Sequence, residues 1–217
     1  MLIAQSPFSS RLFLKICWSE ISLPTADKMD AQENATCLLN PLGLYCYSIM
    51  TKLVVFLGNP GLEYRMTRHN IAWTFCDKAY GQLVFTSKFH SLLAQSGQAY
   101  FQKPQTFMNL SGRSAREASS FFHIDHSCIL AVHDDMELGF AEVKLERTCF
   151  ARGHNGLRSM ASELGTGDFF RLRLGIGRPQ QQDPASYVLS RFSKEQEEWL
   201  DGMFSQAKDA LEQWLET

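Results

Sequence analysis

A buried-strand pattern that runs directly into a turn constrains the fold of this chain more than any other stretch. Leu53 to Leu57 is a continuous apolar run, which is the pattern of a strand buried on both faces. The run stops at four turn formers, Gly58-Asn59-Pro60-Gly61, and Ile71 to Tyr80 then has the pattern of a helix. A buried strand that ends in such a loop delivers polar side chains to the carboxyl edge of a sheet, where open α/β sheets usually place their sites. The polar residues that follow this loop are Tyr64, Thr67, Arg68, His69 and Asn70.

The length and composition fit a soluble globular protein with one main domain. The chain has 217 residues, of which 45% are hydrophobic and 20% are charged, and this balance is typical of such proteins. No apolar run approaches the roughly 18 to 20 residues that span a bilayer. The six cysteines show neither metal-ligand nor disulfide-framework spacing. We therefore expect reduced thiols and a cytoplasmic or organelle-matrix location, without membrane association.

The formal net charge of −2 averages over regions of opposite character. Residues 193–217 carry seven acidic and two basic side chains, whereas residues 50–192 carry twelve acidic and sixteen basic ones. Within Lys144 to Arg178 there are seven basic residues and three acidic ones. Because a local basic face is what phosphate contacts require, the charge is compatible with a nucleic-acid partner but does not demand one.

The first 49 residues differ from the rest of the chain. They mix Ser, Cys and apolar residues without a sustained period, and Pro24 and Pro41 interrupt any helix. We expect residues 1–49 to be an N-terminal extension that is disordered, cleaved or not natively translated. An organelle-targeting peptide is the alternative, since the first 19 residues lack acidic side chains, although arginines are few. Met50 would then begin the main domain, residues 50–217.

Strand and helix patterns alternate along the remaining residues, after a weakly patterned region at 81–98. We expect strands at 99–103, 128–132, 143–145 and 171–176, helices from Asn109 or Ser111 to Phe122, from about 154 to 164 and from Ser193 onward, and a loop at 147–153. Arg171 to Ile176 alternates basic and apolar residues, so one face of that strand should be polar. The alternation predicts an α/β sandwich with a largely parallel or mixed sheet.

Polar sets stand at the ends of three strands or loops, and together they suit chemistry on an ester or amide carbonyl. Asn59 and His69 follow the first strand, Met108-Asn109 precede a helix, and His133-Asp134 end another strand with Asn155 further along. A His–carboxylate pair can activate water, because the carboxylate orients the imidazole and stabilises its protonated form. Asparagines offer neutral donors to a carbonyl or a developing oxyanion without repelling phosphate.

Other chemistries find less support in the sequence. There is no G-x-S-x-G motif for a serine nucleophile and no cysteine in an activating context. His123 with His126, and His133 with Asp134 and Asp135, match no accepted zinc or calcium pattern, so we expect no metal. Gly175-Ile176-Gly177 precedes Arg-Pro rather than a helix and is not a dinucleotide fingerprint.

Five motifs in order resemble the bacterial-type peptidyl-tRNA hydrolase family. They are LGNPG-x-EY-x-x-TRHN at 57–70, PQTFMNLSG at 104–112, VHDDMEL at 132–138, GHNGLRSM at 153–160 and RLRLGIGRP at 171–179. The resemblance covers Lys52 to about Trp214. It implies a single-domain α/β fold with a twisted mixed sheet flanked by helices. It also implies hydrolysis, during translation, of the ester between a peptide and the 3′ end of tRNA by a monomer without a metal or other cofactor.

The resemblance also assigns roles to individual residues. His69 would be the catalytic base and Asp134 its partner. The residues that would bind the peptide and the tRNA 3′ end are Asn59, Tyr64, Met108, Asn109 and Asn155. The tRNA 5′ phosphate would be held by Arg173 with Lys144 or Arg147.

The chain departs from the family pattern around the expected phosphate contacts. Leu138-Gly139-Phe140-Ala141 replaces the usual Leu-Pro-x-Gly turn, and the loop Thr148 to Gly153 is bulkier and has fewer glycines. Glu146 stands where the family tends to place a second basic residue. These departures put the strength and geometry of tRNA binding in doubt, but not the proposed catalytic residues.

Two other functions remain open on the sequence. A relative of the same fold could bind RNA or a partner without turnover, although His69, Asp134 and Asn109 would then have no purpose. A small-molecule esterase could use the same His–Asp pair, although a neutral ester would not need the basic Lys144 to Arg178 region.

Overall fold

The chain divides into two units, residues 1–48 and residues 49–217, in a computed structural model. The structure describes residues 38–39, 45–46, 50–149, 153–179 and 181–217. In the first unit, β1 (Leu38–Leu39) and β2 (Tyr45–Cys46) pair antiparallel. The expected disorder of residues 1–49 lies outside the described residues, apart from these two strands.

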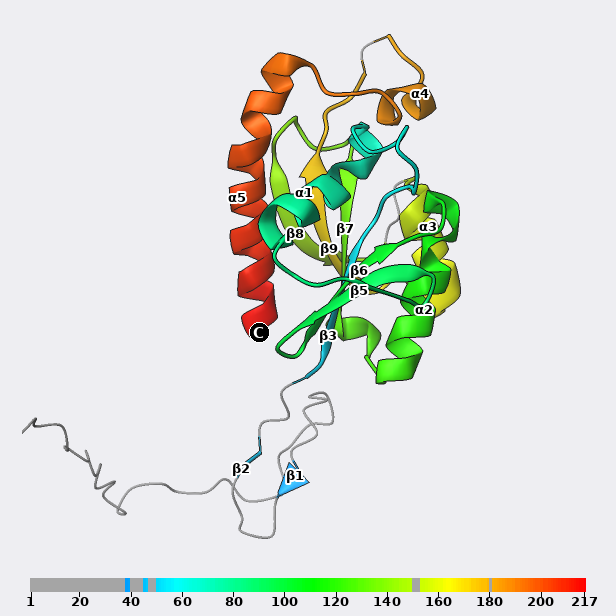
Figure 1. Ribbon diagram of the computed structural model, residues 1–217, viewed down its shortest axis with the longest axis vertical. Helices are drawn as coiled ribbons and strands as arrows, with labels where there is room; N and C mark the ends of the chain where they lie inside the picture. The colour runs from blue at the N-terminus through cyan, green and yellow to red at the C-terminus, as the bar shows by residue number, and fades with distance from the viewer. Residues whose placement is uncertain (1–37, 40–44, 47–49, 150–152, 180) are drawn as a thin grey trace, which may run out of the picture. The chain divides into compact units, whose positions relative to one another are not determined.

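The second unit is a mixed sheet of seven strands between two pairs of helices (Figure 1). The strands are β3 (Lys52–Phe56), β4 (Thr86–Lys88), β5 (Ser91–Ser96), β6 (Ala99–Pro104), β7 (Ile129–Asp135), β8 (Val143–Thr148) and β9 (Phe169–Gly175). The helices are α1 (Ile71–Tyr80), α2 (Ser111–Phe122), α3 (Asn155–Leu164), α4 (Pro184–Val188) and α5 (Lys194–Glu216), with short 3-10 turns η1 (Arg68–Asn70), η2 (Met108–Leu110) and η3 (His126–Cys128). The predicted α/β class is confirmed.

Four parallel strands form the centre of the sheet, and antiparallel strands close both edges. The strand order is β4-β5-β6-β3-β7-β9-β8, in which β6, β3, β7 and β9 run parallel. Because β3 and β7 are neighbours and run the same way, the loops that follow them meet at one edge of the sheet. The polar residues expected after these strands are thereby brought together.

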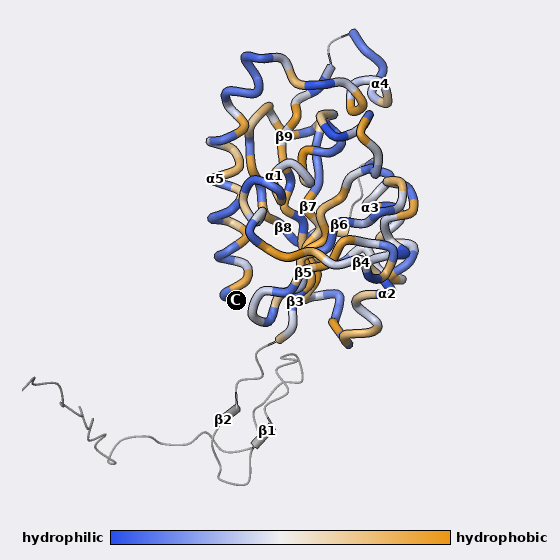
Figure 2. Tube along the Cα trace, viewed as in Figure 1, coloured by the Kyte–Doolittle hydropathy of each residue, from blue (hydrophilic) through white to orange (hydrophobic). Residues whose placement is uncertain are grey.

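Each face of the sheet has its own apolar core, and the most hydrophobic chain lies in the central strands (Figure 2). On one face, alternate residues such as Val54 and Phe56 of β3 pack against α1 and α5. On the other, Leu53, Val55 and Leu57 pack against α2 and α3. This two-sided burial is what the continuous apolar run of β3 predicted.

Several predicted boundaries are confirmed. The helix at 71–80 is α1, and Gly165, in the left-handed conformation with φ of 72°, ends α3 after Leu164. Ser193 caps α5 through a reciprocal capping box, in which the Ser193 hydroxyl accepts from the Gln196 amide and the Gln196 side chain accepts from the Ser193 amide. In the described part of the chain, no helix combines the length and hydropathy needed to cross a bilayer.

Other predictions were wrong in detail. The weakly patterned region 81–98 contains the hairpin of β4 and β5, and β8 extends to Thr148 rather than ending at Leu145. Neither Asn109 nor Ser111 caps α2, because the turn η2 leads directly into it.

Candidate active site

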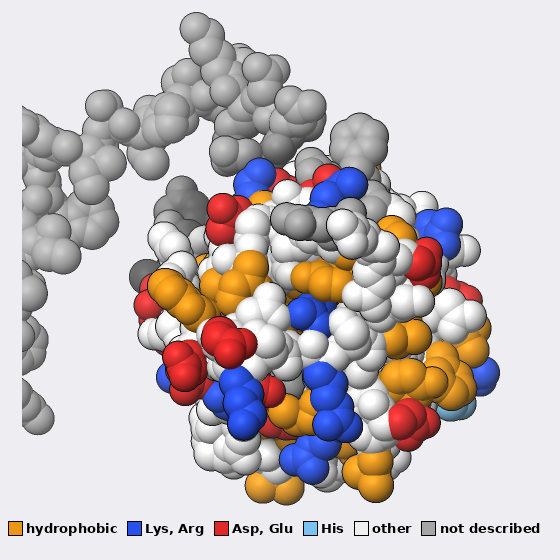
Figure 3. Space-filling model, turned by 90° about the horizontal axis from the view of Figure 1, so that it is seen from above, with side chains coloured by type: hydrophobic (Ala, Val, Ile, Leu, Met, Phe, Trp, Pro, Cys, Tyr) orange, Lys and Arg blue, Asp and Glu red, His pale blue; other side chains and the backbone are white. Residues whose placement is uncertain are grey.

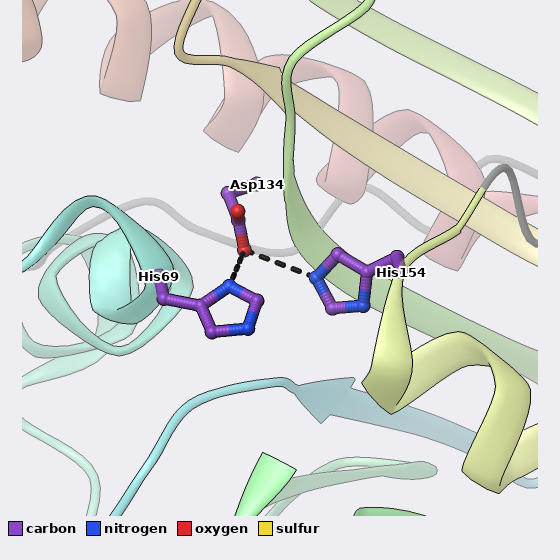
Figure 4. Close-up of side chains that lie close together, drawn as sticks. All are labelled: His69, Asp134 and His154. Atoms are coloured by element: carbon purple, nitrogen blue, oxygen red, sulfur yellow. Dashed lines mark hydrogen bonds and ion pairs between the residues drawn. The ribbon is translucent and has the colours of Figure 1, made fainter. Parts of the chain in front are cut away.

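Two histidine side chains from separate segments converge on one carboxylate oxygen, that of Asp134, at the carboxyl edge of the sheet (Figure 4). Asp134 lies near the end of β7, His69 lies in the turn η1 before α1, and His154 is the N-cap of α3. The Oδ1 atom of Asp134 is 2.8 Å from Nδ1 of His69 and 3.0 Å from Nε2 of His154. All three side chains are at most 10% exposed. The predicted His69–Asp134 pair therefore has the geometry of a hydrogen-bonded dyad.

The backbone of α3 fixes the tautomer of His154. Its Nδ1 atom accepts hydrogen bonds from the amides of Gly156 and Leu157, at 3.1 and 3.4 Å. An imidazole nitrogen that accepts carries no proton, so in neutral His154 the proton is on Nε2, which donates it to Asp134. His154 thus caps the helix and supplies one hydrogen bond to the Asp134 carboxylate.

Asp134 in turn fixes the tautomer of His69. Because a carboxylate only accepts, Nδ1 of His69 carries the proton, and Nε2 of neutral His69 keeps its lone pair. Among the described residues, none hydrogen-bonds to that Nε2 atom. A free, unprotonated Nε2 is the arrangement that a general base requires.

The electrostatics of the pair favour a protonated imidazole next to an ionised carboxylate. Burial alone would lower the pKa of His69, but the charge and hydrogen bond of Asp134 raise the pKa above its ordinary value of 6.5. Burial would raise the pKa of Asp134, but His69 and His154 hold the pKa of this carboxyl far below its usual range. Asp134 therefore stays ionised at neutral pH and stabilises the charge that His69 gains with a proton.

His133, by contrast, is a neutral buried side chain. Burial and the nearby His154 ring lower the pKa of His133 to about 3. Its Nδ1 atom lies 2.7 Å from the backbone oxygen of Asp134 and donates to it, and its Nε2 atom has no hydrogen-bond partner. His133 cannot serve as a cation here. Of the adjacent residues His133 and Asp134, only Asp134 takes part in the dyad.

Asn59 is fixed by two other parts of the site. Its backbone exchanges two hydrogen bonds with the Asn70 side chain, at 2.9 Å for the Asn59 amide and 2.8 Å for its carbonyl. Its Oδ1 atom accepts from the Met108 amide at 2.8 Å. The loop after β3 is thereby tied to the turn that carries His69 and to the turn η2. Gly58 allows the Trp73 ring of α1 to lie against this loop, since a Cβ at position 58 would lie 2.6 Å from the Trp73 indole nitrogen.

The dyad opens into a cavity of about 350 Å³. Its walls come from the end of β7, the start of α3 and the short helix α4. The apolar part of the lining is Met136, Pro184, Ala185 and Val188, and the polar part includes His69, Asp134, His154 and Asn155. A second groove of about 300 Å³, lined by Asn109, Asn155 and Arg158 among others, lies between the turn η2 and the helix α3. Asn155 lines both spaces.

The sequence of the whole domain matches one family. Residues 53–217 match the family model described as peptidyl-tRNA hydrolase. The chain belongs to the peptidyl-tRNA hydrolase family. Among similar curated proteins, the peptidyl-tRNA hydrolase of Citrifermentans bemidjiense is 42% identical over 171 residues, which are 76% of this chain and 91% of that protein. The peptidyl-tRNA hydrolase of Wolinella succinogenes is 44% identical over 170 residues, covering 76% and 87% of the two chains.

The fold agrees with the peptidyl-tRNA hydrolase family. A crystal structure of peptidyl-tRNA hydrolase from Acinetobacter baumannii superposes with a TM-score of 0.71 at 29% identity, over 77% of this chain and 90% of that one. The resemblance of the five motifs is thereby confirmed, together with the mixed sheet that the peptidyl-tRNA hydrolase family implied.

Of the aromatic and sulfur-containing residues expected at a peptidyl-tRNA hydrolase cleft, Met108 is bonded to Asn59 through its amide, and Tyr64 contacts Phe107, the residue before Met108. Tyr64 is half-buried and meets the exposed Phe107 ring edge to face, with 6.3 Å between ring centroids. Met108 is almost fully buried and packs on the first turn of α3, where a Cβ on Gly156 would lie 2.6 Å from its sulfur. Met108 therefore fills the space between the turn η2 and the first turn of α3, and does not contribute to the exposed surface.

Arg173, which the peptidyl-tRNA hydrolase motifs suggest as a phosphate contact, is buried and doubly paired. Its side chain is 3% exposed and contacts Oδ2 of Asp135 at 2.7 Å and Oε1 of Glu146 at 2.9 Å. Lys144 also pairs with Glu146, at 2.7 Å, and Arg147 pairs with Asp168 through two bonds of 2.8 Å. Lys144 and Arg147 are partly exposed, whereas a phosphate could reach Arg173 only by displacing carboxylates.

Basic, acidic and apolar side chains lie interspersed on the face of the molecule that Figure 3 shows. The exposed apolar side chains of the two turns that flank Asn59 are Leu62, Met66, Phe107 and Leu110. Such a mixture suits a ligand that has both apolar and phosphate groups.

Two residues that take part in the hydrogen-bond network around the dyad were not assigned a role from the sequence. Asn70 and His154 both stand inside the motifs, TRHN and GHNG. A histidine directly before the Asn-Gly start of a helix is in an N-cap position, and this was the available signal for His154.

Three groups of the site could hold a metal ion. His69, Asp134 and His154 offer ligand atoms that lie within 4.8 Å of one another. A cation here would have to replace both N–H···O bonds to Asp134 with coordination, which needs the unprotonated nitrogen at Nε2 of His154. The helix cap places the proton on that nitrogen instead. The network is thus complete as a hydrogen-bonded one, and the expectation of a metal-free site stays a prediction.

Proposed function

We propose that this chain hydrolyses the ester bond that joins a peptide to the 3′ end of tRNA, and releases free peptide and tRNA. One observation carries the proposal. His69 is held by Asp134 through Nδ1, at 2.8 Å, so its Nε2 atom is left to accept a proton at the cavity.

In this mechanism a water molecule attacks the ester carbonyl carbon while Nε2 of His69 takes one of its protons. Asp134 stabilises the resulting imidazolium, and His154 holds the Asp134 carboxylate in place. The tetrahedral intermediate then expels the ribose oxygen, which receives the proton from His69. The products are a peptide carboxylic acid, which releases its proton to the solvent, and the tRNA hydroxyl, so the reaction consumes one water and needs no metal or other cofactor.

The asparagines supply neutral hydrogen-bonding groups around the ester. Asn59 is buried and rigid, because its backbone and side chain are both bonded to neighbouring turns. Asn109 and Asn155 are exposed at the second groove. We assign Asn59, Asn109 and Asn155 to the peptide linkage and the tRNA 3′ end, with Tyr64 and Met108 shaping the cleft. Amide groups suit this role since they bind carbonyl and hydroxyl groups without adding charge.

The remaining assignments follow from the same family. We propose that the protein acts in the cytoplasm as a monomer, or in an organelle matrix if residues 1–49 are a targeting peptide. Lys144 and Arg147 remain candidates for tRNA phosphate contacts, and Arg173 would contribute only after exchange of its carboxylate partners.

The direct test is release of peptide from an N-blocked aminoacyl-tRNA and from a longer peptidyl-tRNA by the purified protein. The His69→Ala variant should lower kcat by at least ~100-fold, the low end for loss of a general base, while binding stays nearly intact. Parent protein that binds the substrate without releasing peptide would instead identify a non-catalytic binding relative. Activity with the chelator EDTA present would support the metal-free mechanism.

A further inference from the structure

Arg68, next to the proposed base in sequence, has an unusual environment. The side chain belongs to a residue only 7% exposed, yet no described carboxylate forms an ion pair with it. Its guanidinium instead donates to the Ser190 hydroxyl at 2.7 Å, to the Arg191 carbonyl, and to the Gln196 side-chain oxygen at 2.7 Å. A buried cation without a counter-ion is costly unless its environment compensates for the lost hydration.

Two aromatic rings provide part of that compensation. The guanidinium carbon of Arg68 lies 4.4 Å from the centre of the Tyr187 ring and 4.9 Å from that of Phe192. Arginine stacks well on aromatic faces because its charge is delocalised over a plane and weakly hydrated. Tyr187 belongs to α4, and Phe192 lies in the segment between α4 and α5. Arg68 therefore ties the catalytic turn η1 to the segment that carries α4.

Besides the Arg68 side chain, backbone pairing joins the turn η1 to the segment after α4, because the Arg68 amide donates to the Ser190 carbonyl at 2.9 Å and Thr67 pairs with Arg191. The helix α4 itself has few attachments, with Tyr187 and Val188 partly buried against the core. None of its residues is buried, although Pro184, Ala185 and Val188 form one wall of the cavity beside His69. The Tyr187 hydroxyl, at the far end of the same ring, donates to the Ile176 carbonyl at 2.7 Å. With so little apolar burial, α4 depends for its position on the contacts of Tyr187 and of the segment that follows.

We propose that Arg68 is a positioning residue, which holds α4 against the catalytic turn and thereby sets the wall of the cavity that receives the peptide part of the substrate. This inference rests on the proposed function, and it adds a role for a residue that does not touch the reacting atoms. The His69–Asp134 bond does not involve the Arg68 side chain. Loss of that side chain should therefore weaken binding of the peptide more than it slows the chemical step.

The experiment compares Arg68→Met and Arg68→Lys with the parent on two substrates, a tRNA that carries one blocked amino acid and a tRNA that carries a peptide of several residues. Methionine keeps an unbranched apolar side chain of similar length but no charge, and lysine keeps the charge but cannot bond to Ser190 and Gln196 at once. We expect Arg68→Met to raise KM for the longer substrate by about 10-fold, with kcat within about 3-fold and KM for the short substrate within about 3-fold. Arg68→Lys should give a smaller rise.

Binding of an uncleavable amide-linked peptidyl-tRNA gives a second readout that does not depend on turnover. Its Kd should rise in parallel with KM for the longer substrate. Tyr187→Leu, which removes the stacked ring, should reproduce the rise, and the double variant should add little to either single one because both disrupt the same contact. Lys208→Met is the control, since Lys208 pairs with Glu212 on the exposed face of α5, away from both cavities, and it should behave as the parent.

Three results would overturn the role of Arg68: an unchanged KM and Kd for the longer substrate, an equal rise for both substrates, or a loss of kcat with unchanged KM. A lower melting temperature with parental kinetics would likewise show that Arg68 is only structural. Failure of the parent chain to release peptide would count against the proposed function, while the Kd comparison would still decide on Arg68.

Discussion

Replacing Asp134 by asparagine tests the electrostatic part of the mechanism with little change in shape. The amide oxygen can still accept hydrogen bonds from His69 and His154, which lie 2.8 and 3.0 Å from the carboxylate oxygen now present. What disappears is the negative charge that, in the proposed mechanism, stabilises His69 once it has taken a proton from water. The variant should therefore fold and bind substrate, yet hydrolyse it slowly.

The expected loss can be bounded from the geometry. A hydrogen bond to a charged group exceeds a neutral one by about 1.5 kcal/mol, and two unit charges about 4 Å apart interact by about 4 kcal/mol at an effective dielectric constant near 20. These values correspond to a decrease in kcat of about 10- to 1000-fold. An amide rotated to present its NH₂ group to His69 would move the proton to Nε2 and add to the loss.

The same change should displace the pH profile in a definite direction. In the parent protein the Asp134 carboxylate outweighs burial and raises the pKa of His69 above 6.5, so activity should fall as the pH drops through a value above 6.5. Without the carboxylate only burial remains, and burial lowers the pKa of His69. The acid limb of kcat/KM should then lie at lower pH in Asp134→Asn, even though the plateau is lower.

The assay is the initial rate of peptide release between about pH 5 and pH 9, at several substrate concentrations, so that kcat and kcat/KM are separated. Asp201→Asn is the matched control, because Asp201 pairs with Lys78 at the surface and not with a histidine. A kcat for Asp134→Asn within about 3-fold of the parent, or an acid limb that stays in place or moves to higher pH, would refute the reasoning.

Three further variants address other parts of the chain. His154→Asn should keep the N-cap of α3, since asparagine is a good cap, but lose the 3.0 Å bond to Asp134, so kcat should fall about 10-fold with little change in melting temperature. Glu146→Gln should remove one carboxylate partner of Arg173, and so lower KM for 5′-phosphorylated substrate and steepen the salt dependence of that KM. An equal effect on substrate without the 5′ phosphate would show that Arg173 does not contact this phosphate. A chain that begins at Met50 should melt and turn over like the full chain, and a markedly lower melting temperature would show that residues 1–49 belong to the fold.

Local patterns predicted the elements whose environment is uniform along their length. β3 is buried on both faces, and α1 and α5 have continuous apolar stripes, so the periodicity of each could be read directly. The hairpin of β4 and β5 escaped because all three residues of β4 are exposed and β5 becomes exposed at its end. An edge strand that faces water lacks the alternation on which such a prediction depends.

The His69–Asp134 dyad could be predicted from the sequence, but the contact of His154 with Asp134 could not. Asp134 lies near the end of one buried strand and His69 lies beyond the loop after another, and adjacent parallel strands bring such residues together. The contact between His154 and Asp134 depends instead on where the start of α3 lies relative to β7, which is a property of the assembled sheet. The hydrogen bonds from Gly156 and Leu157 that select the tautomer of His154 have no separate signature in the sequence.

The strand that carries Arg171 and Arg173 shows most clearly what alternation can and cannot tell. The pattern correctly placed both side chains on one face, but that face is buried, at 1% and 2% exposure. β8 brings Glu146 opposite Arg171, and β7 ends in Asp135, so carboxylates from two neighbouring strands reach the Arg173 guanidinium. Burial of Arg173 is tolerable only because these partners neutralise it. A phosphate would have to compete with both carboxylates. A lysine in place of Glu146 would add a positive charge here, whereas Glu146 makes Arg173 part of an internal ion-pair network.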